Sequence, residues 1–279
     1  MHFQQSVVHL SSMLSVTSAL LLFWLLLAAV FTLLWYLGER RGNAAIVDVA
    51  WSWGLGLTAV GLALVLSGDP GRRLLLAGLL GFWGLRLGWH IFVRLRAEDE
   101  EEGRYRYLRQ HWGERAFVMF WVFFQIQALS IVLLAAPIAV LMNFTPGPLG
   151  LWDLLGGIWI AAALAGEAIA DRQLARWKQD PANRGKTCRR GLWAWSRHPN
   201  YFFEWCHWLG YPIIGVPLLL SGQWGAWVFL WLGAVVMLLL LLRMTGIPYT
   251  EKQALRSRGE DYARYQREVS AFVPLPPKH

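Results

Sequence analysis

The residues best equipped for chemistry stand where a basic loop runs into an apolar stretch. Arg197 and His198 come directly before Pro199 and Asn200, and Glu204 follows one helical turn later. Proline followed by asparagine is typical of a helix start, so Asn200 could act as a helix cap. Capping accounts neither for Glu204 nor for the adjacent basic pair. A helix N-terminus flanked by basic side chains suits a phosphate group, which is the chemistry we expect here.

A second polar group lies in the first half of the chain. Asp48, Trp51 and Ser52 are three and four residues apart, which places them on one helix face. One interpretation makes Asp48 the buried partner of an arginine such as Arg86 or Arg94. The other makes it a carboxylic acid that can donate a proton to a substrate.

Arg86, His90 and Arg94 follow one another at steps of four residues and form a continuous polar stripe. The long side chain of Arg94 can reach the membrane surface, so it needs no special role. Arg86 and His90 stand deeper in an apolar run. We therefore expect them to line a cavity.

Further polar groups occur on a later helix and in the tail. Glu167 and Asp171 share one helix face, and Lys178 returns to it two turns on. A solvated helix end explains Glu167 poorly. Tyr249 and Tyr262 lie among charged residues, and by themselves they would indicate only a solvated amphipathic face.

The elements that must position these side chains are membrane helices. Of 279 residues, 56% are hydrophobic and 16% charged, whereas soluble domains carry roughly a quarter charged residues. A spanning helix needs about 20 mostly apolar residues. Such runs lie at residues 17–37, 44–66, 73–93, 117–141, 149–170, 201–220 and 223–243. The pattern predicts an all-α polytopic membrane protein of about seven transmembrane helices, with 249–268 as a cytoplasmic amphipathic helix.

Charge in the loops predicts how these helices are oriented. Segments 38–43, 94–116, 171–198 and 243–279 hold 2, 6, 8 and 7 of the 26 lysines and arginines. Cytoplasmic segments are enriched in basic residues, so we expect an outside N-terminus and a cytoplasmic C-terminus. The predicted location is a bacterial inner membrane.

Two classes of ligand are disfavoured. The net charge of +8 comes from loops between apolar runs, which favours membrane lipids and anionic ligands over nucleic acid. Cys188 and Cys206 lack spaced histidine partners and are placed poorly for a disulfide. We expect no metal site.

The chain is interpreted as one membrane domain, residues 1–279, made of two halves. Residues 17–141 would form a four-helix half that holds the substrate. Residues 149–279 would form the half that holds a cofactor.

The motifs together resemble the membrane-bound steroid 5α-reductase-like family, and in particular its bacterial branch of uncharacterised members. The central motif is GLWAWSRHPNYFFEW at Gly191–Trp205, and the resemblance covers most of the chain. Related families include sterol reductases, which use NADPH, and isoprenylcysteine carboxyl methyltransferases, which use S-adenosylmethionine. Other matching segments are Asn43–Trp51, Trp83–Leu87, Asp171, Glu260–Tyr262 and Phe272–Pro274.

The resemblance implies a cofactor cavity that opens to the cytoplasm under the tail helix. The methyltransferases tend to carry a different residue where Asn200 stands, which favours NADPH over S-adenosylmethionine. Carried over by motif, the residues around the cofactor would be Asp171, Lys178, Arg197, His198, Asn200, Tyr201, Tyr249 and Tyr262, with Arg104 and Arg109 near its phosphates.

The chain also departs from the family pattern. Animal 5α-reductases polarise the substrate ketone with a Gln-Glu pair in the second span and a tyrosine in the third. Here Asp48–Gly54 holds no such pair, His90 stands near the place of the tyrosine, and Glu167 replaces an asparagine. The resemblance therefore does not imply a steroid substrate.

The functional hypothesis is NADPH-dependent reduction of a C=C bond conjugated to a carbonyl in a lipophilic small molecule. A hydrogen-bond donor to the developing enolate can supply about 2.7–4 kcal/mol. Asp48, His90 and Glu204 are the predicted catalytic residues, and Trp51, Ser52 and Arg86 the predicted substrate contacts. The alternatives are an S-adenosylmethionine-dependent methyltransferase and a non-catalytic transporter or lipid-binding protein.

Overall fold

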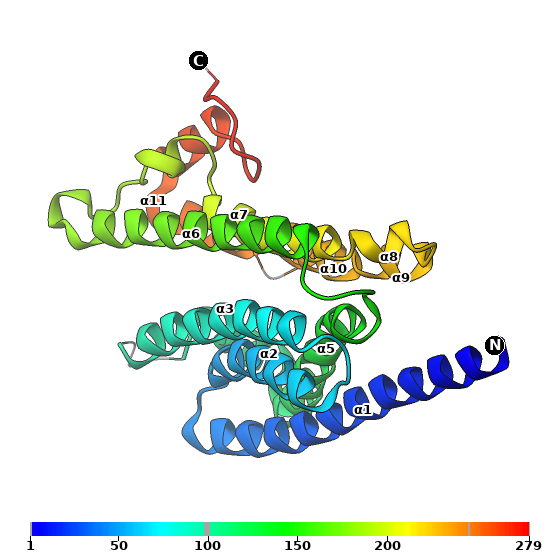
Figure 1. The fold of residues 1–279 in the computed structure, drawn as a ribbon. Helices are drawn as coiled ribbons and strands as arrows, with labels where there is room; N and C mark the ends of the chain where they lie inside the picture. Colours follow the sequence, from blue (N-terminus) through cyan, green and yellow to red (C-terminus); the bar gives the residue numbers. More distant parts are fainter. Residues whose placement is uncertain (1, 98–100, 245, 279) are drawn as a thin grey trace. The chain divides into compact units, whose positions relative to one another are not determined.

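The computed structural model describes residues 2–97, 101–244 and 246–278, and all regular elements of these residues are helices (Figure 1). The chain forms two compact units. The first contains the residues up to Gly150 together with Pro217–Ala226, and the second contains the remainder.

The first unit is a bundle of helices in which α2 packs on α3, and α1 and α2 both pack on α5. Its helices are α1 (His2–Arg41), α2 (Ile46–Val65), α3 (Pro70–Arg96), α4 (Gly103–Trp112) and α5 (Ala116–Phe144). Glycines allow the close approach of α2 and α3, because a Cβ on Gly84 would meet the Ser52 carbonyl oxygen at 2.5 Å. Helix α3 begins at Pro70, and the Asp69 carboxylate accepts a hydrogen bond from the Arg72 amide at 2.8 Å.

The second unit is organised around α6 and α7, which pack along each other, and α10 packs on α7. Its longer helices are α6 (Leu151–Gln179), α7 (Pro199–Ile214), α10 (Leu232–Leu239) and α11 (Ile247–Glu268). Short 3-10 helices at Pro181–Asn183 and Gly191–Ala194 shape the loop between α6 and α7. The short helices α8 (Val216–Leu220) and α9 (Trp224–Phe229) follow α7 in the chain, and a π-helical turn at Leu240–Met244 follows α10.

Residues after α11 return along the loop that precedes α7. The backbone amide of Arg197 donates to the Ser270 carbonyl at 2.8 Å, and that of Leu275 donates to the Trp195 carbonyl at 3.0 Å. The Ser196 hydroxyl donates to the Phe272 carbonyl at 2.8 Å. The tail is thus fastened over the entry to α7.

Six helical segments in the described residues are long and apolar enough to cross a membrane. They are Ser11–Arg41, Ile46–Val65, Pro70–Arg96, Gly103–Phe144, Leu151–Gln179 and Trp224–Glu268. The predicted span at 201–220 differs, because α7 ends at Ile214 and α8 forms a separate short helix. Pro212 and Gly215 explain the interruption, since proline and glycine weaken a continuous helix.

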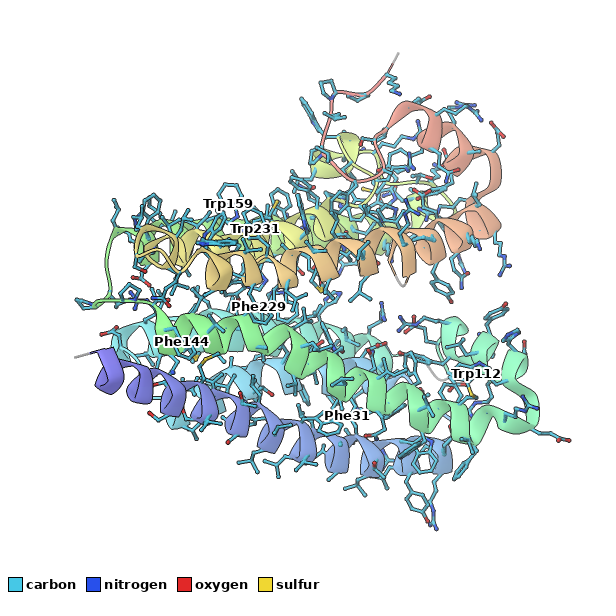
Figure 2. The ribbon with its side chains drawn as sticks, turned by 90° about the vertical axis from the view of Figure 1, so that its right-hand side faces the viewer. Phe31, Trp112, Phe144, Trp159, Phe229 and Trp231 are labelled. Carbon is cyan, nitrogen blue, oxygen red and sulfur yellow. The ribbon has the colours of Figure 1, made fainter. Side chains whose placement is uncertain are left out.

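Large apolar side chains cover the outer surfaces of these helices. Leu14, Leu25 and Leu33 of α1 are 60, 61 and 56% exposed. Trp159 of α6 is a further exposed apolar side chain (Figure 2). Such exposure is unfavourable in water but suits lipid.

Candidate functional site

A network of three side chains joins α2 to α4 in the first unit. Asp48 accepts hydrogen bonds from Arg104 at 2.6 Å and from the Tyr105 hydroxyl at 2.8 Å. Arg104 also donates to the Tyr105 hydroxyl at 2.8 Å, and Tyr105 is fully buried. The Asp48 side chain is 17% exposed. This arrangement fixes Asp48 as a hydrogen-bond acceptor.

Asp48 is paired with an arginine, as one interpretation expected, but the partner is Arg104 and neither of the two examples given, Arg86 and Arg94. Arg94 instead pairs with Glu102 at 3.2 Å. Tyr105 was missed by the sequence analysis, because it lies in a strongly charged segment that gives no sign of burial. The one available signal was an aromatic residue directly beside Arg104.

The two arginines expected near cofactor phosphates have partners in their own unit. Arg104 pairs with Asp48, as described above. Arg109 pairs with Glu39 at 2.9 Å and with Glu101 at 3.1 Å. Their contact with phosphates stays a prediction.

The predicted substrate residues are distributed over α2 and α3. The Trp51 ring nitrogen donates to the Ser130 hydroxyl at 2.9 Å. Ser52 is fully buried, and its hydroxyl donates to the Asp48 carbonyl at 2.9 Å, so a ligand could reach it only if the helices moved. Arg86 is half-buried and His90 is exposed.

A second network, in the second unit, converges on Glu251 of α11. Arg197 donates to Glu251 at 2.6 Å, and Gln266 donates to its other oxygen at 2.7 Å. His198 lies 3.3 Å from the same carboxylate, and the Tyr262 hydroxyl donates to it at 3.5 Å. Glu251 therefore connects the start of α7 to both ends of α11.

Arg197 and His198 have a structural role in this network, because both contact Glu251. Arg197 also donates to the backbone carbonyls of Gln266 and Val269, at 2.9 and 2.6 Å. His198 is 3% exposed and stacks on Tyr201 at 5.4 Å. Burial lowers the pKa of His198 and the Glu251 carboxylate opposes this, with a net decrease. Its imidazole is therefore neutral near pH 7 and not suited to attract a phosphate by charge.

Sequence reasoning missed Glu251 and Gln266. Both lie in the stretch that was interpreted as a solvated amphipathic face. The Tyr249-Thr250-Glu251 segment was noted, but only the folded chain shows that its carboxylate points at Arg197.

A third polar group joins α6 to α7. Helix α7 begins at Pro199 with His198 as its cap residue, so Asn200 is not the cap. Instead its side-chain amide donates to Asp171 at 3.2 Å. The Asn200 Oδ1 atom is buried and has no hydrogen-bond partner among the described residues. Glu204 is half-buried one turn further along α7.

Other predicted cofactor residues lie on α6, α7 and α11. Tyr201 reaches α11, where its hydroxyl lies 3.3 Å from that of Thr250. The neighbouring Tyr249 hydroxyl accepts a hydrogen bond from Gln253 at 2.9 Å. Lys178 is exposed near the end of α6.

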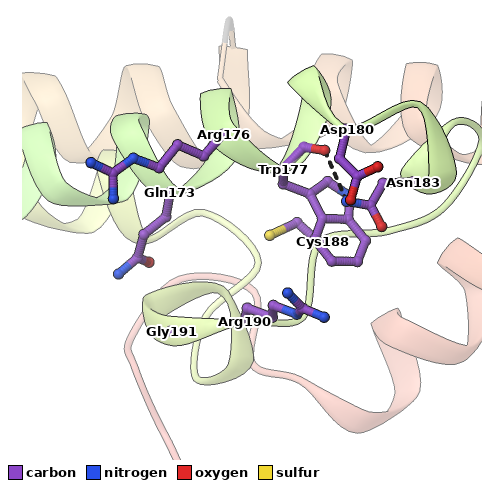
Figure 3. A pocket seen from close by; sticks show the side chains of 8 residues that line it. All are labelled: Gln173, Arg176, Trp177, Asp180, Asn183, Cys188, Arg190 and Gly191. Atoms are coloured by element: carbon purple, nitrogen blue, oxygen red, sulfur yellow. Dashed lines mark hydrogen bonds between the residues drawn. The ribbon is translucent and has the colours of Figure 1, made fainter.

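A hollow of about 260 Å³ lies against the end of α6 and the loop that follows it (Figure 3). Asp171 and Gln173 are two residues apart, about 200° around a helix, so the hollow and Asp171 occupy different faces. Burial raises the pKa of the Cys188 thiol, which disfavours a reactive thiolate. The lining residues are Gln173, Arg176, Trp177, Asp180, Asn183, Cys188, Arg190 and Gly191, none of which was a predicted site residue.

The helices and their exposed apolar surfaces define an integral membrane protein with several spanning segments. Residues 34–269 match the family described as Protein of unknown function (DUF1295), and the chain belongs to this family. The family is steroid 5α-reductase-like, in agreement with the resemblance of the motifs.

An uncharacterized protein of the yeast Schizosaccharomyces pombe is similar to this chain. The two sequences are 28% identical over an alignment of 276 residues, and the match covers 86% of this chain and 75% of the yeast protein. No solved structure matches. The bacterial branch and the bacterial inner membrane stay predictions.

Proposed function

We propose that this protein is a membrane enzyme that uses NADPH to reduce a C=C bond conjugated to a carbonyl in a lipophilic small molecule. The observation that carries the proposal is the pair formed by Asn200 and Asp171 at the first turn of α7. A buried polar atom without a partner costs about 1–3 kcal/mol. A ligand that donates a hydrogen bond to Asn200 Oδ1 would recover that energy.

The chemistry of the pair suits a nucleoside cofactor. A carboxylate such as Asp171 accepts hydrogen bonds from ribose hydroxyls, and the Asn200 oxygen accepts one from a carboxamide or an adenine amino group. The membership in a steroid 5α-reductase-like family supports NADPH as the cofactor.

The surrounding network supports the same proposal because it holds the pair in place. Glu251 fixes Arg197 and His198, the two residues directly before α7. A site whose supporting side chains are already bonded loses little entropy when the ligand binds.

The reaction adds a hydride to the β-carbon of the enone and a proton to its α-carbon. NADPH held at Asn200 and Asp171 would supply the hydride, with NADP⁺ as the oxidised product. The protein must position the enone, exclude water and donate a hydrogen bond to the carbonyl oxygen. Asp48 is an acceptor from Arg104 and Tyr105, so an orienting role fits it. His90 and Glu204 stay the candidates for the proton donor.

Calorimetric titration of the purified protein in detergent tests the proposal. Saturable binding of NADPH, with weaker or no binding of S-adenosylmethionine, is the expected result. Saturable binding of S-adenosylmethionine alone would replace the reductase with a methyltransferase. Binding of neither would favour the non-catalytic alternative, a transporter or lipid-binding protein.

A further inference from the structure

The hollow at the end of α6 is bordered by two arginines, Arg176 and Arg190, which are both exposed. In the part of the chain that the structure describes, no carboxylate lies in ion-pair distance of either guanidinium. Arg190 lies over the Trp177 ring at 5.3 Å, which fixes one guanidinium beside the hollow. Figure 3 shows the two arginines on different walls.

The acidic member of the lining does not cancel this charge. Asp180 begins the short helix at Pro181–Asn183, where its carboxylate accepts a hydrogen bond from the Ala182 amide at 2.9 Å. The loop segment 171–198 carries eight basic and two acidic residues. The hollow is therefore an electropositive site.

The walls are held in place without any ligand. The Leu192 amide donates to the Gln173 side chain at 2.9 Å, and Asn183 donates to the Trp177 carbonyl at 3.1 Å. Gly191 has a φ of +58°, and a Cβ there would meet the Gln173 amide at 2.6 Å. Glycine is therefore required for this wall.

Position along α6 indicates where a ligand would come from. Apart from Asp153 and Glu167, the helix is apolar from Leu151 to Ala170 and it is polar afterwards, so Trp177 lies near the end of a candidate membrane span. Tryptophan at such a boundary is typical of the headgroup level of a bilayer. Basic pockets at this level bind anionic headgroups.

We propose that the hollow binds a phosphate-bearing group between Arg176 and Arg190, supplied by an anionic phospholipid headgroup or by a free phosphate. The site lies on a different face of α6 from Asp171, and it does not depend on the proposed reductase activity. Guanidinium groups bind phosphate through paired hydrogen bonds, which a single lysine cannot reproduce.

The test uses full-length protein in neutral detergent with two probes, dihexanoyl phosphatidic acid and inorganic phosphate. We expect saturable binding of a probe that weakens about tenfold in Arg176→Gln and in Arg190→Gln. Arg184→Gln removes the same charge from an exposed position of the same loop outside the hollow, and it should leave binding nearly unchanged.

The two probes separate the sources. Binding of both indicates a general phosphate site, and binding of the lipid alone indicates a headgroup site that also uses glycerol and acyl contacts. The proposal is overturned if neither probe saturates, or if all three variants weaken binding equally. Arg176→Lys provides a check that the planar guanidinium matters, because it keeps the charge and loses the paired geometry.

Discussion

His198 shows how a single side chain acquires properties from its surroundings. It lies between the Tyr201 ring and the Glu251 carboxylate and is 3% exposed. In water its pKa would be 6.5, and burial lowers the pKa in the folded protein. The neutral imidazole is the form that the fold selects.

This shift predicts a dependence of stability on pH. Below pH 6.5 the unfolded chain takes up a proton at His198 that the folded chain resists. Stability therefore falls as pH is lowered through 6.5, and it is insensitive to this group above that value. Thermal unfolding in detergent on both sides of pH 6.5 measures the effect. His198→Gln should flatten the decline, whereas His111→Gln, at an exposed position, should retain it. An equal slope in all three proteins would contradict the assignment.

Contacts between elements explain how α7 and α11 form one site. Glu251 lies near the start of α11 and accepts a hydrogen bond from Arg197, which also donates to the Val269 carbonyl after the end of α11. Arg197 and Glu251 are 10 and 15% exposed. A carboxylate with several donors in such a shielded place contributes more than a surface ion pair.

Glu251→Gln keeps the shape of the side chain and removes its charge. We expect the free energy of unfolding to fall by about 2 kcal/mol, because Arg197 loses its charged acceptor. Denaturant unfolding in detergent measures this change. Glu260→Gln provides the matched control, since its pair with Arg267 is 71 and 64% exposed and the same substitution should have no measurable effect. A similar loss in both variants would show that the Glu251 network is not special.

The observed helices also show which features of the fold can be predicted from the sequence. The run at 44–66 became α2 at Ile46–Val65, because an uninterrupted apolar stretch of that length has few other structures available. Hydropathy did not detect the break at Pro212 and Gly215. Comparison of motifs placed Asn200 and Asp171 in the same predicted cofactor site. It did not identify Glu251 or Tyr105, because contacts between distant segments leave no local periodicity in the sequence.

At the scale of the whole molecule, the distribution of loop charge predicts orientation. The segment 171–198 should face the cytoplasm, and the turn at Ser221 should face the other side. The exposed apolar helices show that the chain enters the membrane, and the predicted orientation rests on the loop charges.

Cysteine labelling in right-side-out and inverted vesicles tests the orientation. Arg184→Cys should react with a membrane-impermeant maleimide only in inverted vesicles, and Ser221→Cys only in right-side-out ones. Cys188 and Cys206 are buried, so the parent protein should give a low background. The reverse pattern would overturn the predicted topology.

The most direct test of the central claim is a fluorescence titration with NADPH on the purified protein and on matched variants. The account predicts saturable binding that weakens about tenfold in Asn200→Ala and in Asp171→Asn. Asn183→Ala, which removes another half-buried amide from the second unit, should bind as the parent does. Absence of binding in the parent protein, or equal affinity in all four proteins, would contradict the claim that the Asn200 and Asp171 pair forms a cofactor site.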